Sequence, residues 1–296
     1  MAVGRVLLVV GILVLLFIPY LLWGTGLMTA HSQDVLRQQF QADQHRTGAH
    51  PTKPKPATSV AVTPQTAPTT ADPAPGSPVG LIAIPKIGLS MVVVEGTDTA
   101  ELQQGPGHYP GTPLPGEAGN SAIAGHRTTY LHPFYNLDQL VPGDEITVTT
   151  LQGVFDYDVT SSEIVDPSDV AVVDDTTTPQ LTLTTCNPRF SARQRLVVHA
   201  ALVASSLTHP TTAPVVVKAK PKAKTHETLA TESTGSWPAA IILGIIVAAI
   251  ATLAWIATTR TKGGRRALVL VVGIVAWLVV VFFFFEAVGP LLGSSF

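Results

Sequence analysis

Three long segments without a single charged residue constrain this chain more than any other feature of its sequence. They run from Val6 to Trp23, from Trp237 to Thr259 and from Ala267 to Phe285. A helix needs about 20 apolar residues to span a bilayer core, whereas the apolar part of a signal peptide has about 7–15. We therefore expect three membrane-spanning helices, the first of them an uncleaved anchor. These segments also help to explain why only 13% of the 296 residues are charged.

The cations beside these segments predict how the chain is oriented. Arg5 precedes the first segment, and the loop 260–266 carries four cations and no anion. Short cytoplasmic loops of membrane proteins are enriched in Lys and Arg. The N-terminus and the basic loop are therefore expected in the cytoplasm. This predicts a multi-pass protein of the cell membrane whose central region lies on the extracellular face.

Two stretches rich in Pro and Thr, the second also rich in Lys, separate the expected spans from the central region. Such stretches cannot bury enough apolar surface to offset the entropy of ordering, so both are expected to be extended tethers. The expected organisation is an anchor (1–30), a tether (31–78), a folded domain (79–205), a linker (206–236), a helix (237–259), a basic loop (260–266), a helix (267–288) and a tail (289–296).

The central region has the pattern of a small all-β domain. Runs rich in Val, Ile and Thr alternate with Gly, Pro and Asp: Gly80–Pro85, Glu145–Thr150, Phe155–Val159, Gln180–Thr185 and Arg195–Ala200. Two of these runs alternate apolar and polar residues, which is the period of a half-buried strand. The pattern predicts a β-barrel or sandwich. The formal net charge of −2 argues against a nucleic-acid partner, because such a partner requires a concentrated basic face.

The single cysteine, Cys186, lies where a predicted strand ends. One cysteine excludes an intramolecular disulfide framework and a multi-cysteine metal site. Arg195 opens the next strand, and His126 follows a short predicted strand after the turn at Gly125. A thiolate that attacks an amide, an imidazole that protonates the leaving amine and a guanidinium that stabilises the oxyanion form a transacylation site. A buried structural cysteine is the ordinary alternative.

Other residues of the same types compete for these roles. His108 and His132 are alternative bases, and Arg189 and Arg193 are alternative cations. We favour His126 because it leaves the sheet directly, and Arg195 because it opens the strand. Four aspartates (Asp166, Asp169, Asp174 and Asp175) lack the spacing of a calcium-binding loop and are interpreted as solvated.

Four motifs surround these residues: Thr182-Leu183-Thr184-Thr185-Cys186, Arg195-Leu196-Val197-Val198, Gly107-His108-Tyr109-Pro110-Gly111-Thr112 and Gly119–Tyr130. They resemble those of sortases, the transpeptidases that attach surface proteins to the cell wall of Gram-positive bacteria. The resemblance covers about Val79 to Val203 and is strongest to the class E sortases of actinobacteria.

The resemblance implies an eight-stranded sortase β-barrel and a role for each matching residue. Cys186 would be the nucleophile, His126 the general acid and base, and Arg195 the group that stabilises the oxyanion or positions substrate. Thr185 and Tyr109 match residues that contact substrate. No cofactor or metal is implied.

The implied reaction is cleavage of the Thr–Gly bond in a Leu-Ala-x-Thr-Gly or Leu-Pro-x-Thr-Gly signal of a secreted protein, through a Cys186 thioester. An amine of a peptidoglycan precursor such as lipid II would then accept the acyl group. One alternative is a pilus-polymerising sortase, although Asp72-Pro73-Ala74 lacks the aromatic residue of the lid in that class. The other alternative is a membrane-tethered β module that binds ligands without catalysis.

Overall fold

The computed structural model describes residues 11, 15–17, 19–20, 24–48, 66–70, 73–207, 237–260 and 264–288. These residues fall into two compact units. One comprises residues 1–25 and 232–294, and the other comprises residues 26–231 and 295–296. Most of the first predicted span, most of the linker 206–236 and the tail 289–296 lie outside the described residues.

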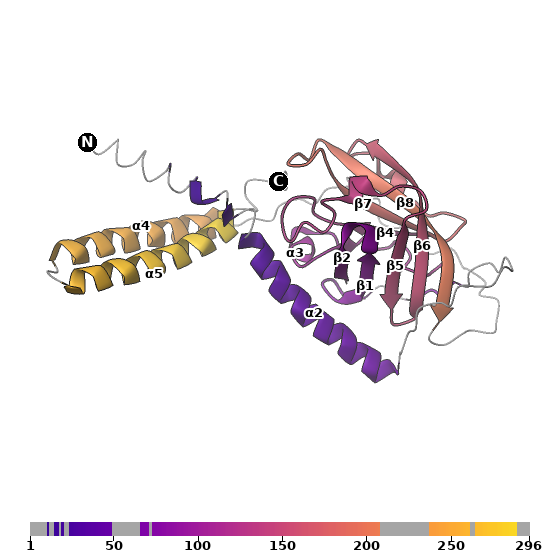
Figure 1. Ribbon diagram of the computed structural model, residues 1–296, viewed down its shortest axis with the longest axis horizontal. Coiled ribbons are helices and arrows are strands. Elements are labelled where there is room, and N and C mark those ends of the chain that lie inside the picture. The colour runs from indigo at the N-terminus through magenta and orange to yellow at the C-terminus, as the bar shows by residue number, and fades with distance from the viewer. Residues whose placement is uncertain are drawn as a thin grey trace. The chain divides into compact units, whose positions relative to one another are not determined.

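The first unit is helical. Helices α4 (Trp237–Arg260) and α5 (Gly264–Val288) lie side by side (Figure 1) and occupy the two apolar segments near the C-terminus. Tyr20, Val247 and Phe285 are among the buried residues of its apolar core. Within the part of the chain that the structure describes, no helix meets the combined length and hydropathy of a membrane span. The three predicted spans are therefore not confirmed.

The second unit contains a closed eight-stranded barrel, which confirms the predicted all-β fold. Its strands are β1 (Pro78–Ile84), β2 (Leu89–Glu95), β3 (Gly107–His108), β4 (Asn120–Ala124), β5 (Glu145–Thr150), β6 (Gly153–Val165), β7 (Gln180–Asn187) and β8 (Gln194–Leu207). They follow the order β1-β2-β3-β4-β7-β8-β6-β5 around the barrel. The connections hold the short helices η2 (Pro85–Ile87), α3 (Thr99–Leu102), η3 (Leu137–Gln139) and η4 (Val170–Val173). The pairs β2/β3 and β4/β7 are parallel.

The alternation of side chains along β7 separates the barrel interior from its outer face. Leu181 and Leu183 belong to the barrel core, whereas successive residues of a strand point to opposite faces. Thr182, Thr184 and Cys186 consequently lie on the outer face. A smaller apolar cluster covers that face beside them, and its buried members are Leu102, Tyr109, Ala122, Ala124 and Val173.

Helix α2 (Thr25–Thr47) stands where part of an extended tether was expected, so the tether prediction is wrong for residues 31–47. Leu36 and Phe40 are only 4% and 5% exposed, and Leu36 packs with Val92 and Val94 of β2. Residues four apart share one face of a helix. The apolar stripe is narrow, and the polar composition of the segment concealed it.

Polar side chains of α2 also complete the edge of β2. The short strand β3 pairs with Val94 and Glu95 of β2 and does not extend along β2 as far as Val92. The side-chain amide of Gln33 donates to the Val92 carbonyl at 2.9 Å and accepts from the Val92 N–H at 2.8 Å. Arg37 donates to the carbonyl of Ser90. The helix thus supplies hydrogen bonds that a neighbouring strand would otherwise make.

A second part of the expected tether is also packed on the barrel. Ala67 is 2% exposed, and its N–H donates to the carbonyl of Gly116 at 2.7 Å. Thr70 donates to the carboxylate of Glu117 through both its N–H and its hydroxyl. The prediction of a mobile tether is therefore wrong for residues 66–70, because these residues pack on the barrel and are hydrogen-bonded to it.

Candidate active site

Cys186 and Arg195 face each other across the last two strands of the barrel. They are direct partners in the antiparallel register of β7 and β8, and side chains of such partners lie on the same face. The Arg195 side chain is buried, and its Nη1 donates to the carbonyls of Ala192 and Gln194 at 2.9 and 3.0 Å. These bonds hold the guanidinium at the strand end that also carries the thiol, as the spacing predicted.

His126 is brought to the same end of the barrel by β4, which runs parallel to β7. The N–H of Gly125 donates to the Thr184 carbonyl at 3.1 Å, and the Thr185 hydroxyl donates to the Gly125 carbonyl at 2.7 Å. A side chain at Gly125 would meet the ring of Phe134 at 2.6 Å. The backbone that leads into His126 is therefore fixed on both sides.

The imidazole of His126 is largely shielded from solvent. The Tyr130 ring lies against it, with 4.9 Å between ring centroids and 35° between ring planes. Its Nε2 is buried and has no hydrogen-bond partner among the residues that the structure describes. Burial lowers the pKa of His126 to about 4, because desolvation disfavours the charged imidazolium. The neutral ring is therefore the form present near neutral pH, and it can accept a proton.

The two expected substrate-contact residues lie on different faces. The Tyr109 hydroxyl is 3.0 Å from the Thr184 hydroxyl on the outer face, and burial raises the pKa of Tyr109. Arg195 and Cys186 are both close enough to affect that phenol electrostatically. Thr185 instead points away from this face, and its hydroxyl supports the peptide before His126.

Arg127 is a site residue that the sequence analysis missed. Its Nη1 donates to the Cys186 carbonyl at 3.1 Å and to the Asn187 side chain at 2.9 Å. Its Nη2 lies 3.1 Å from the carboxylate of Asp138. The available signal in the sequence was a cation directly after His126. Arg127 ties the loop that carries His126 to the backbone of the candidate nucleophile.

The competing residues have other contacts. His108 is fully buried, with Nδ1 2.7 Å from Glu95 and Nε2 3.0 Å from the Pro113 carbonyl. His132 is exposed on a loop. Arg189 pairs with Asp138 at 2.9 Å and lies over the ring of Tyr135. These contacts indicate structural roles for His108 and Arg189.

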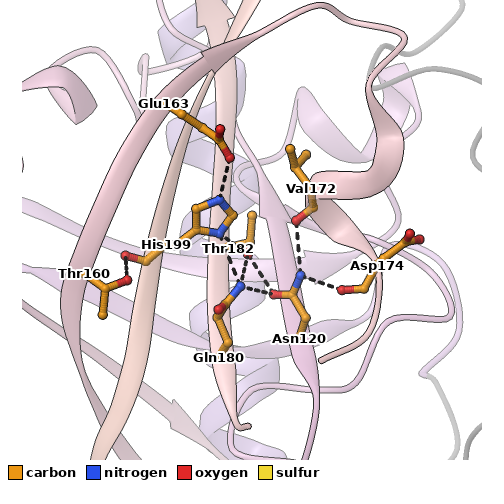
Figure 2. A network of polar contacts seen from close by, with 8 residues as sticks. All are labelled: Asn120, Thr160, Glu163, Val172, Asp174, Gln180, Thr182 and His199. Carbon is orange, nitrogen blue, oxygen red and sulfur yellow. Dashed lines mark hydrogen bonds and ion pairs between the residues drawn. The ribbon is translucent and has the colours of Figure 1, made fainter. Parts of the chain in front are cut away.

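A polar network joins β8, β7 and β4 to the β6–β7 connection, as Figure 2 shows. His199 lies between Glu163 and Thr182, at 3.1 and 3.0 Å, and Thr182 donates to Asn120 Oδ1 at 2.7 Å. The Asn120 amide then donates to the carbonyls of Val172 and Asp174. This chain of bonds holds η4, and with it Val173, against the outer face beside Tyr109.

The geometry is that of a cysteine acyltransferase displayed on a rigid barrel. A thiol, a buried guanidinium and an imidazole whose Nε2 has no hydrogen-bond partner among the described residues gather at one end of three neighbouring strands. Among the described residues, no group of three His, Cys, Asp or Glu side chains could hold a metal ion.

Comparison with known proteins identifies the family. Residues 82–203 match the model of the sortase domain. Sortase SrtE1 of Streptomyces coelicolor is 31% identical over 218 residues, which cover 68% of this chain and 56% of the relative. Sortase D of Bacillus subtilis is 35% identical over 117 residues, covering 39% and 58%. The solved sortase E1 of Streptomyces coelicolor with a tripeptide in its active site is 32% identical, with a TM-score of 0.43, and covers 45% of this chain and 93% of its own.

The chain belongs to the sortase family of cysteine transpeptidases, and the expected similarity to class E sortases is confirmed. It spans somewhat more than half the length of the two curated relatives above.

Proposed function

We propose that this protein is a sortase that cleaves the Thr–Gly bond of a Leu-Ala-x-Thr-Gly or Leu-Pro-x-Thr-Gly signal and transfers the acyl fragment to a cell-wall precursor amine. The observation that carries the proposal is the convergence of Cys186, Arg195 and the His126 loop at one end of β4, β7 and β8. Membership of the sortase family supports the same chemistry.

In the first half-reaction, neutral His126 takes the proton of the Cys186 thiol while the sulfur attacks the Thr carbonyl carbon. The new C–S bond leaves negative charge on the carbonyl oxygen, and Arg195 is the cation opposite the nucleophile that can stabilise it. The C–N bond then breaks, and the imidazolium returns the proton to the departing Gly amine. A thioester at Cys186 remains.

In the second half-reaction, an amine attacks the thioester carbon and loses a proton to His126. The C–S bond breaks, and the imidazolium returns the proton to the sulfur, so the thiol is restored. Because the pKa of His126 is low, the imidazolium formed in each step is a strong acid. It passes its proton on quickly, to the departing amine in the first step and to the sulfur in the second. Tyr109 would lie beside the peptide on the face that carries the thiol, whereas Thr185 would act indirectly, through its hydrogen bond to the backbone before His126.

The test uses the full-length protein in detergent with paired Ala- and Pro-containing signal peptides and diglycine as the amine. We expect cleavage, a peptide–diglycine product and a stronger reaction with the Ala peptide. Cys186→Ala should abolish both products. Retained cleavage in Cys186→Ala, or no cleavage by the wild type, would contradict the transpeptidase and favour a binding module.

We also propose that the protein is anchored in the cell membrane with its barrel outside the cell. The support is the sequence alone: three charge-free segments, Arg5 and the basic loop 260–266. Such a protein should stay in the membrane fraction after alkaline carbonate extraction. Protease added to intact protoplasts should digest the barrel and spare the basic loop, whereas release by carbonate would contradict the anchor.

A further inference from the structure

Tyr130 lies in a loop whose backbone is difficult to form. Tyr130, Leu131 and His132 are three successive non-glycine residues with positive φ, at 53°, 60° and 38°. Such conformations are uncommon for bulky residues, and they persist only where surrounding contacts impose them. The same loop presents the Tyr130 ring to His126.

Hydrogen bonds close this loop from within. The N–H of Phe134 donates to the His126 carbonyl at 3.1 Å, and the N–H of His132 donates to the Thr129 carbonyl at 2.7 Å. Phe134 is fully buried in the barrel core. The loop thus begins and ends at fixed points, and Tyr130 is carried between them.

A side chain from outside the loop holds the tyrosine itself. Gln103, directly after α3, donates from Nε2 to the Tyr130 hydroxyl at 3.1 Å. This bond fixes the far end of the phenol, while the ring face rests on the imidazole.

Helix α2 supports both sides of that contact. The Thr29 hydroxyl donates to the Gln103 carbonyl at 2.8 Å, and Gln33 donates to the Gln104 carbonyl at 2.9 Å. At Gly26 a side chain would come within 3.2 Å of Leu131. The first turns of α2 therefore contact Gln103, which supports Tyr130, and lie close to Leu131 in the loop that bears Tyr130.

We propose that Tyr130 is a positioning residue for His126, and that Gln103 and helix α2 hold it in place. The inference rests on the proposed catalytic role of His126. The ring restricts rotation of the imidazole and excludes water from it, so that the neutral base faces the thiol in one orientation. The segment before the barrel is then part of the active site and not a spacer.

The experiment compares full-length variants in detergent. Tyr130→Ala removes the ring and should lower kcat about 10- to 100-fold with a small change in KM, since misplacement of a catalytic group by about 1 Å has effects of this size. Tyr130→Phe keeps the ring but loses the hydrogen bond from Gln103, so its kcat should fall only about 3- to 10-fold. Gln103→Leu, which removes the same bond, and Thr29→Val should resemble Tyr130→Phe, whereas Thr47→Val, the same change as Thr29→Val at the far end of α2, should have no effect.

A second measurement does not depend on turnover. The NMR titration of His126 should move from about pH 4 upward toward its ordinary pKa near 6.5 in Tyr130→Ala. If the wild type cleaves no peptide, the proposed function fails but this titration still tests the contact. If Tyr130→Ala does not fold, the titration in Gln103→Leu decides. The inference would be overturned if kcat and the pKa of His126 were unchanged in these variants, or if Thr29→Val and Thr47→Val had the same kcat.

Discussion

The guanidinium of Arg127 donates a hydrogen bond to the main-chain carbonyl of Cys186 at 3.1 Å. The residue beside the candidate base is thereby attached to the residue that carries the nucleophile. Asp138 accepts from both Arg127 and Arg189, so the β4–β5 and β7–β8 connections share one carboxylate. The relative position of thiol and imidazole depends on this junction.

Arg127→Met should therefore reduce kcat/KM about 10- to 100-fold, because the loop and the nucleophile lose their direct link. Arg127→Lys should recover a part of the activity, since an ammonium keeps the charge but not the fork of donors. Arg193→Met, the same change at an exposed position of the neighbouring loop, is the control. Equal activity of Arg127→Met and Arg193→Met would show that the junction has no catalytic role.

Asn120→Asp should raise KM for the signal peptide about tenfold, which corresponds to about 1.4 kcal/mol. The carboxylate would face the carbonyls of Val172 and Asp174 without N–H donors and so release η4. Alkylation of Cys186 by iodoacetamide should be unchanged. Thr160→Val removes a bond at the border of the same network (Figure 2) and should leave KM as it is. A KM effect of equal size in both variants would contradict the role of Asn120.

The buried imidazole of His126 should make the protein less stable in acid. The pKa of His126 is about 4 in the folded protein and about 6.5 in the unfolded chain. Between these values the unfolded chain binds a proton that the folded protein does not, so stability falls as pH decreases from 6.5 to 4. His126→Gln has no titrating imidazole and therefore lacks this pH-dependent contribution to the free energy of unfolding. Urea unfolding at several pH values should show the wild type losing more stability than the variant, by at most about 1.4 kcal/mol per pH unit.

His108→Ala should destabilise the fold by about 3 kcal/mol, because Glu95 would lose its partner in a fully buried position. Its kcat per folded molecule should remain close to that of the wild type. His126→Ala should give the opposite pattern, with activity lost and most of the stability kept. Active-site titration combined with urea unfolding distinguishes loss of stability from loss of kcat. A lower kcat in His108→Ala would indicate that His108 acts as a base.

The strands that could be predicted were those with a clear local pattern. Leu181 to Thr185 alternates because one face of β7 fills the barrel and the other carries polar contacts. The run Met91–Val94 in β2 is apolar throughout, so it lacks that period, and β3 has two residues. Neither strand was predicted, although the barrel itself was.

The site could be predicted as far as residue types and strand ends define it. The roles of Arg127 and Tyr130 could not be predicted in this way. The contacts of Arg127 come from Asn187 and Asp138, which the fold brings together from distant parts of the chain. Tyr130 depends on a helix that the sequence led us to expect as an extended segment.

The pairing of Gln33 with Val92 bears on how this protein can be shortened. An exposed strand edge can capture another extended chain. A fragment that starts at the first strand would leave the peptide groups of Val92 and Ser90 open to such capture. We expect this fragment to self-associate. A fragment that begins before α2 should not, because α2 still covers the edge of β2.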